Sequence, residues 1–267
     1  MARVTRFAPS PTGPLHLGHA YAALVAAERG DRVLLRIEDI DTARCKPEWE
    51  SEIYDDLQWL GIRFEPDVLR QSTRKPAYAT ALAHLHAQGL TYHCTCTRAD
   101  IRAALSAPQE GTDGPIYPGT CREAGHETGA LRLNLSKAMA KLGDLTFVET
   151  GTNPATYRFN PVQLIQSTGD VILSRADIGV AYHLAVVVDD AAQGITEVTR
   201  GADLFAITPL HVALQRLLNL PTPQYHHHRL IRDEDGRRLA KRDDARAVSK
   251  YRAEGATLAE IKMKIGF

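Results

Sequence analysis

The N-terminal region indicates a strand, a loop, a helix and a second strand, and this order constrains the fold more than any other feature. Residues 4–8 have the pattern of a short buried strand, an alanine-rich helical pattern covers about residues 18–29, and residues 33–37 are Val-Leu-Leu-Arg-Ile. Apolar strands without alternation are typical of parallel sheets that helices cover on both faces. The sequence therefore predicts an α/β fold with a doubly wound parallel sheet, whose ligands bind beyond the carboxyl ends of the strands.

The remaining chain divides into a segment of different character and a return of the α/β pattern. Between about residues 91 and 150, cysteines, prolines and glycines surround one short helical run near 98–105, and residues 131–135 alternate like a half-buried strand. Further helices and strands are predicted at about residues 47–60, 74–88, 182–190, 195–199, 209–218 and 225–231. We expect residues 1–90 and 177–243 to form the doubly wound domain that carries the site. Residues 91–176 would form an inserted subdomain, and residues 244–267 a short C-terminal helical extension.

The composition is that of an ordinary globular protein and narrows the partners only slightly. The 32 Lys and Arg residues balance the 32 Asp and Glu residues, so a nucleic-acid surface would have to be a local patch. No stretch approaches the roughly 20 apolar residues of a membrane span, and no basic region followed by an apolar segment marks a signal peptide. Four cysteines fit a reducing compartment. We therefore expect a cytoplasmic protein without a membrane partner.

A Pro- and Gly-rich loop after the first predicted strand carries two histidines, His16 and His19, on either side of a Leu-Gly pair. If the helix begins near residue 17, the two imidazoles face the same way. They also lie at a helix N-terminus, where backbone N–H groups and the helix dipole attract phosphate. The pattern favours a nucleotide-phosphate site, with a simple helix cap as the alternative.

A basic loop at residues 236–243, after the predicted strand at 225–231, supplies a second element. Alone it indicates a solvated charged turn. Together, the two loops resemble the signatures of class I aminoacyl-tRNA synthetases, a His-x-Gly-His loop and a late Lys-Met-Ser-Lys-Ser loop. In the second signature Arg238 replaces the first lysine, Ala240 replaces the serine, and Lys241 is the retained lysine. These departures leave a non-catalytic paralogue that binds glutamate or RNA as an alternative.

Further segments are similar to the glutamate-specific branch of this family, namely residues 6–13, 36–41, 186–190 and 200–203. The resemblance implies a Rossmann-like sheet with an inserted, zinc-containing subdomain of the acceptor-binding type. It implies that L-glutamate is bound by Arg6, Ala8, Pro9, Ser10, Glu38, Tyr182 and Arg200. The arginines offer planar donor forks for carboxylates, and the acidic side chain can pair with an ammonium group. The resemblance also implies that ATP, accompanied by Mg²⁺, is bound by residues of which the histidines and the lysine are catalytic: Pro9, His16, Gly18, His19 and Lys241.

The position of the second signature near the end of the chain bears on the acceptor. Glutamyl-tRNA synthetases continue after it into an anticodon-binding domain, whereas only a short segment follows Lys241 here. We expect no such domain, and the chain is similar to truncated paralogues that transfer glutamate to the queuosine base in the anticodon stem-loop of tRNA(Asp). The expected enzyme is a monomeric ligase that forms glutamyl-adenylate from ATP and glutamate without tRNA. The alternative enzyme is a catalytic body that charges a tRNA 3′ end.

The cysteines of the inserted segment indicate a structural metal site. Cys94, Cys96 and Cys121 supply three soft ligands, and zinc prefers four tetrahedral nitrogen or sulfur donors. By chemistry alone the fourth ligand is open, with histidine as the default, among His93, His126 and Tyr117. The family pattern implies Tyr117, because residues 117–121 match it.

A run of three histidines at residues 226–228 lies on a predicted strand. Successive strand side chains point to opposite faces, so only His226 and His228 could share a metal ion. We interpret the run as ordinary strand residues. Cys45 stands apart from the other cysteines, and we expect it to be no metal ligand.

Overall fold

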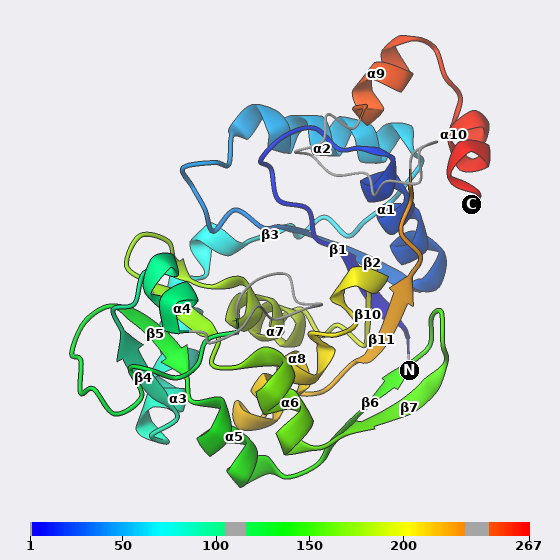
Figure 1. Ribbon diagram of the computed structural model, residues 1–267. Coiled ribbons are helices and arrows are strands. Elements are labelled where there is room, and N and C mark those ends of the chain that lie inside the picture. Colours follow the sequence, from blue (N-terminus) through cyan, green and yellow to red (C-terminus); the bar gives the residue numbers. More distant parts are fainter. Residues whose placement is uncertain (1, 105–115, 233–245) are drawn as a thin grey trace.

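Parallel strands form the centre of the structure, as the N-terminal pattern predicts. The computed structural model describes residues 2–104, 116–232 and 246–267 (Figure 1). The parallel strands lie side by side in the order β3 (Leu69–Arg70), β2 (Arg32–Ile37), β1 (Val4–Phe7), β10 (Glu197–Gly201) and β11 (Gln224–His228). Between β1 and β10, the backbone N–H of Thr196 donates to the carbonyl of Val4 at 3.0 Å.

Helices cover both faces of these strands, which confirms the doubly wound class. Consecutive residues of β2 enter different apolar clusters, because Leu34 packs into one and Leu35 into the other. One cluster includes residues of α1 (Leu17–Arg29) and α2 (Pro47–Trp59). The other includes residues of α3 (Lys75–Ala87), α7 (Tyr182–Ala192) and α8 (Thr208–Leu217). Among the described residues, no helix has the length and apolar content that crossing a membrane requires.

The segment between α3 and α7 forms a separate antiparallel sheet and a hairpin. The sheet consists of β4 (Thr91–Cys94), β5 (Ala130–Leu133), β8 (Ile172–Arg175) and β9 (Gly179–Val180). The helices of this segment are α4 (Arg98–Ala104), α5 (Leu135–Leu142) and α6 (Pro161–Thr168). The hairpin of β6 (Leu145–Glu149) and β7 (Ala155–Phe159) instead extends the sheet of β10 and β11, since Glu149 pairs with Tyr225 in parallel. The domain boundaries given above remain predictions.

Two strands, β5 and β11, end earlier than predicted. The strand expected over residues 131–135 stops at Leu133, because the side chain of Asn134 accepts a hydrogen bond from the N–H of Lys137 and begins α5. The strand expected over residues 225–231 ends at His228. The structure also contains two short 3₁₀ turns, η1 (Gln71–Thr73) and η2 (Ala202–Leu204), and two C-terminal helices, α9 (Val248–Ala253) and α10 (Leu258–Ile265). In the C-terminal segment α9 packs on α2, and α10 packs on α1 (Figure 1).

The contact of α9 with α2 contains a buried acid whose ionisation opposes folding. Asp56 is 0% exposed, and among the described residues its carboxylate has no hydrogen bond and one ion pair, with Arg252 at 3.5 Å. Burial outweighs this arginine and raises the pKa of Asp56 to about 7. The folded state therefore holds the proton more tightly than the unfolded state does. The free energy of unfolding should fall as pH rises from about 4 to 7, by at most about 4 kcal/mol.

The substitution Asp56→Asn should remove this dependence. We expect urea denaturation to give the variant a higher free energy of unfolding than the wild type at pH 8, with the difference shrinking toward pH 5. Asp55→Asn, at the exposed neighbouring position, is the matched control. An Asp56→Asn variant that is equally destabilised at both pH values would contradict the expectation.

Candidate active site

A cavity of about 380 Å³ lies beyond the carboxyl ends of β1, β2 and β10, where a parallel sheet binds its ligands. Its walls come from the end of β1 with the following loop, the residue after β2, the start of α7 and the end of β10. His19 also lines the cavity. All seven residues expected to contact glutamate line this cavity: Arg6, Ala8, Pro9, Ser10, Glu38, Tyr182 and Arg200. The structure therefore brings these residues together from distant parts of the chain.

Two arginines and two acidic side chains form a buried ion cluster at this cavity. Arg6 Nε donates to Asp190 Oδ1 at 2.9 Å, and Arg36 Nη1 donates to the same oxygen at 2.6 Å. Arg36 Nη2 donates to Glu38 Oε1 at 3.2 Å. Burial would raise the pKa of Asp190, but Arg6 and Arg36 outweigh burial and hold this pKa below its ordinary value. For Glu38, burial outweighs Arg36 and Arg6 and raises the pKa.

Arg200 lines the same cavity but has different partners. Its Nε donates to His227 Nε2 at 3.1 Å, its Nη2 donates to Thr208 Oγ1 at 2.7 Å, and its Nη1 lies 2.8 Å from His211 Nδ1. None of these partners is a carboxylate, and Arg200 has no ion pair within the part of the chain that the structure describes. Arg200 is only 6% exposed. The cavity therefore presents a poorly hydrated, uncompensated cation, which suits a carboxylate ligand.

His16 and His19 cap α1 with one ring nitrogen each. The backbone N–H of Gly18 donates to His16 Nδ1, and the backbone N–H of His16 donates to His19 Nδ1, each at 3.1 Å. Because Nδ1 accepts in both rings, each ring is neutral and carries its proton on Nε2, which is then a donor. The helix-cap alternative is therefore confirmed for Nδ1. The predicted phosphate contact concerns Nε2 and stays a prediction.

The glycine of the first signature has a steric reason. A Cβ on Gly18 would lie 3.0 Å from Cε1 and 3.1 Å from Nδ1 of His16. Since these atoms belong to a ring that the helix cap holds in place, a side chain at residue 18 would displace the imidazole. Gly18 therefore preserves the orientation of His16.

The second signature lies outside the described residues, and with it Arg238, Ala240 and Lys241. The chain that follows it contacts the first signature directly. The N–H of Val248 donates to the carbonyl of Leu15 at 2.8 Å, and Ala247 forms an isolated antiparallel bridge with His16. Residues 15–16 and 247–248 are thus neighbours in space.

Three cysteines form a cluster that is able to hold a metal ion such as zinc. The Sγ atoms of Cys94, Cys96 and Cys121 all lie within 4.8 Å of one another. The hydroxyl oxygen of Tyr117 lies 3.4 Å from Cys94 Sγ and 3.7 Å from Cys96 Sγ. Ligands at the corners of a zinc tetrahedron are separated by roughly 3–4 Å, so the four atoms suit one ion.

The other two residues considered as the fourth ligand have different neighbours. His93 is directed to the carbonyl of Gly129 at 3.4 Å, and His126 to the hydroxyl of Thr95 at 3.3 Å. Cys45 lies near the carbonyl of Glu38, at 4.0 Å, and is not part of the cluster. The geometry therefore favours Tyr117 as the fourth ligand, in agreement with the family pattern.

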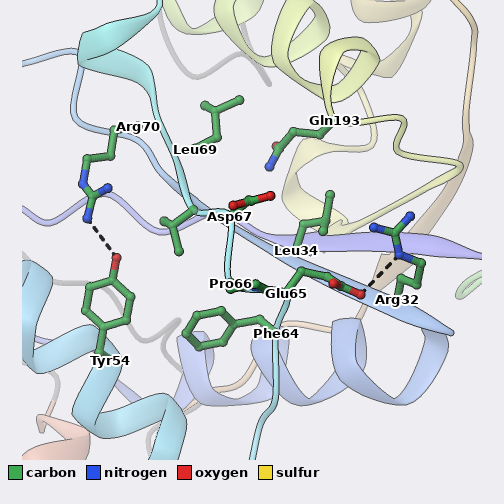
Figure 2. Close-up of a pocket in the computed structure, with 11 residues that line it drawn as sticks. Arg32, Leu34, Tyr54, Phe64, Glu65, Pro66, Asp67, Leu69, Arg70 and Gln193 are labelled. Atoms are coloured by element: carbon green, nitrogen blue, oxygen red, sulfur yellow. Dashed lines mark hydrogen bonds and ion pairs between the residues drawn. The ribbon is translucent and has the colours of Figure 1, made fainter.

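A larger hollow, of about 780 Å³, is lined by residues of β2 and β3 and holds none of the predicted site residues (Figure 2). Several polar side chains that line it are hydrogen-bonded to one another. Arg70 donates to the hydroxyl of Tyr54 at 3.2 Å, and Arg32 donates to Glu65 at 3.2 Å. We assign no ligand to it.

Sequence reasoning missed the buried partners of the site arginines. Arg36 and Asp190 lie within the segments that carry the resemblance, but the expected site includes neither. The sequence indicates His227 only as a strand residue, and the expected site does not include His211 or Glu149. The one available signal was an acidic pair, Asp189 and Asp190, inside an otherwise apolar helical pattern.

Comparison with known proteins gives consistent sequence relationships. Residues 3–263 match the family of the catalytic domain of class I tRNA synthetases (E and Q). A glutamyl-Q tRNA(Asp) synthetase of Rhodobacter capsulatus is 56% identical, over 98% of this chain and 99% of that protein. A protein of the same name from Thiobacillus denitrificans is 43% identical, over 99% of this chain and 86% of its own length.

Solved structures of similar fold are longer than this chain. A glutamate tRNA ligase from Elizabethkingia meningosepticum, in complex with its amino acid, has a TM-score of 0.67 and 27% identity. The match covers 91% of this chain and 53% of the ligase, so the chain spans about half of that length. Methionyl-tRNA synthetase of Mycobacterium tuberculosis has a TM-score of 0.61 at 14% identity, which shows a shared fold alone.

Proposed function

Since the chain belongs to the glutamyl-Q tRNA(Asp) synthetases, within the class I glutamate and glutamine tRNA synthetases, we propose that it activates L-glutamate with ATP and transfers it to queuosine in tRNA(Asp). It is a ligase of this family. The observation that carries the proposal is the single cavity that collects all seven predicted glutamate contacts beside His19. We further propose a cytoplasmic monomer that acts on the queuosine-bearing anticodon stem-loop.

The ion pairs of the cavity support a distinct role for each charged side chain. Arg200, whose charge no described carboxylate neutralises, would bind a glutamate carboxylate through its outer N–H groups. Arg6 is already paired with Asp190 and would add a weaker, neutralised donor. Glu38, whose pKa burial raises, would pair with the substrate ammonium, and this positive charge would favour the ionised carboxylate. Tyr182 would donate its hydroxyl, and Ser10 would complete the wall with the backbone of residues 8 and 9.

In the first half-reaction, a glutamate carboxylate oxygen forms a bond to the α-phosphorus of ATP, and the bond to the pyrophosphate oxygen breaks. The protein supplies position and charge stabilisation rather than covalent chemistry. The Nε2–H groups of His16 and His19 would donate to phosphate oxygens at the N-terminus of α1. Lys241 would bind the departing pyrophosphate. Mg²⁺ would accompany ATP, and we assign no side chain to it.

In the second half-reaction, a hydroxyl of queuosine attacks the carbonyl carbon of glutamyl-adenylate, and AMP leaves. The test compares transfer of labelled glutamate to queuosine-containing and queuosine-free tRNA(Asp). We expect transfer only to the first, and glutamate-dependent ATP–pyrophosphate exchange without tRNA. Equal transfer to both tRNAs would favour the 3′-end charging alternative. Absence of exchange would favour the non-catalytic alternative.

We propose that the three-cysteine cluster holds one structural zinc ion, with Tyr117 as the fourth ligand. The cluster lies at the end of β4, away from the cavity, so the ion would stabilise the local segment and take no part in the reaction. Arg132 stacks on the ring of Tyr117, with 3.8 Å from Cζ to the ring centroid. This contact would hold the tyrosine in place for the ion.

Removing one thiol should release the ion. We expect Cys121→Ser to lower the bound zinc from about one ion per chain to near zero and to lower the melting temperature. Metal content measured by atomic spectroscopy, together with thermal unfolding, checks this. Cys45→Ser is the matched control and should keep both values. Loss of zinc in the control, or its retention in Cys121→Ser, would contradict the assignment.

A further inference from the structure

Arg200 is held by buried groups that are not themselves part of the proposed glutamate site. Its three hydrogen-bond partners, Thr208, His211 and His227, are each at most 1% exposed. They engage Nε, Nη2 and Nη1 at 3.1, 2.7 and 2.8 Å. The plane of the guanidinium is therefore fixed from one side, while two of its five N–H groups are not used by these partners.

The hydrogen bond from Arg200 also fixes the protonation of His227. An arginine can only donate, so His227 Nε2 must accept and the ring proton must lie on Nδ1. His227 Nδ1 lies 2.5 Å from Glu149 Oε2, and the other oxygen of Glu149 accepts from the backbone N–H of His227 at 3.0 Å and of Gly151 at 2.7 Å. Burial, followed by the charge of Arg200, lowers the pKa of His227 to about 4. The ring is thus neutral at neutral pH.

We propose that Glu149 and His227 are positioning residues that orient Arg200 toward the glutamate cavity while leaving its charge uncompensated. The inference rests on the proposed function, in which Arg200 binds a glutamate carboxylate. A carboxylate in direct contact would neutralise the arginine, as Asp190 does for Arg6 at 2.9 Å. A neutral imidazole placed between Glu149 and Arg200 transmits orientation without direct contact of opposite charges. The substrate carboxylate then meets a preorganised cation.

This arrangement gives part of the histidine run a specific purpose. His226, the preceding residue of β11, points to the opposite face and lies 3.2 Å from the hydroxyl of Thr150. Among the described residues, the group of side chains that could hold a metal ion consists of cysteines and includes none of these histidines. The alternation of the strand therefore places one histidine of the run, His227, against Arg200.

The test replaces the carboxylate that fixes the imidazole. Every group around Glu149 is a donor, so in Glu149→Gln either orientation of the amide places an NH₂ group against an N–H. His227 can relieve this by moving its proton to Nε2, which then opposes the Nε–H of Arg200. In glutamate-dependent ATP–pyrophosphate exchange, we expect KM for glutamate to rise by about tenfold or more, with KM for ATP within about twofold of wild type.

Two variants of His227 and one control separate positioning from general stability. His227→Gln keeps an oxygen acceptor for Arg200 and should retain a KM for glutamate closer to wild type than His227→Leu. His226→Leu changes the opposite face of the same strand and should leave both KM values unchanged. Melting temperatures identify any variant that does not fold. If Glu149→Gln does not fold, the comparison of His227→Gln with His227→Leu tests the positioning role in its place.

The outcomes distinguish this inference from the proposed function. A wild-type protein without glutamate-dependent exchange overturns the proposed function itself. A wild type that exchanges, together with Glu149→Gln and His227→Leu variants that keep the wild-type KM for glutamate, overturns the positioning role alone. An equal rise of both KM values, or no difference between His227→Gln and His227→Leu, also overturns it.

Discussion

Replacing Arg200 with methionine is expected to lower kcat/KM for glutamate in ATP–pyrophosphate exchange by about 100- to 1,000-fold. The change removes a buried cation whose loss would leave a substrate carboxylate unpaired, and such losses are worth about 3–4 kcal/mol. Arg200 suits this test because it has no ion pair among the described residues, so the substitution leaves no acidic group of the protein behind.

The readout must separate glutamate binding from loss of structure. KM for ATP should change by less than about threefold, because the residues expected to bind ATP lie in the histidine loop and the second signature and do not include Arg200. Arg216→Met, an exposed substitution on α8, is the matched control and should retain wild-type kinetics. If Arg200→Met keeps the wild-type kcat/KM for glutamate, the assignment of this arginine to the substrate carboxylate is wrong.

The substitution Asp190→Asn should produce the largest loss of stability. One oxygen of Asp190 lies 2.9 Å from Arg6 Nε and 2.6 Å from Arg36 Nη1, and Arg36 is 0% exposed. Removing the charge leaves two buried guanidinium groups with Glu38 as the remaining acid of the cluster. Breaking such a pair costs about 3–5 kcal/mol, which urea denaturation measures directly.

The dependence on pH provides a second test of the same cluster. The two arginines hold the pKa of Asp190 below its ordinary value, so its stabilising effect is present above about pH 4 and is lost as pH falls through the lowered pKa. The difference between wild type and Asp190→Asn should therefore shrink at acid pH. Asp67→Asn, an exposed substitution, is the control. A variant within about 1 kcal/mol of wild type at pH 7 would exclude this role for Asp190.

The elements that the sequence predicted are those whose local pattern is strong. The continuous apolar run at residues 33–37 predicted a strand of a parallel sheet, and the alanine-rich pattern before it predicted the helix that connects this strand to the first one. The hairpin of β6 and β7 was missed, although Leu145, Phe147 and Glu149 alternate as buried residues of a strand. Its membership in the central sheet depends on pairing with Tyr225, which is distant in the chain and invisible to a local pattern.

The site residues were predictable to different degrees for a physical reason. The loop of His16 and His19 is contiguous, so its pattern could be recognised, whereas the glutamate contacts required the family resemblance. The buried partners are single charged or polar residues on separate elements, such as Glu149 and Asp190. Glu149 cannot be told from a surface residue in the sequence, and only the apolar helical pattern around Asp190 marks that residue, because the roles of both come from long-range contacts that folding creates.

The bridge between His16 and Ala247 limits how far Lys241 of the second signature can lie from the histidine loop, and so sets its effective concentration there. Lys241 precedes Ala247 by six peptide units, so a fully extended chain places its Cα within about 21 Å of Ala247. One group confined to a sphere of that radius has an effective concentration on the order of tens of millimolar. A short tether to the histidine loop thus gives the retained lysine, which we propose binds the phosphates, an effective concentration far above that of the protein itself.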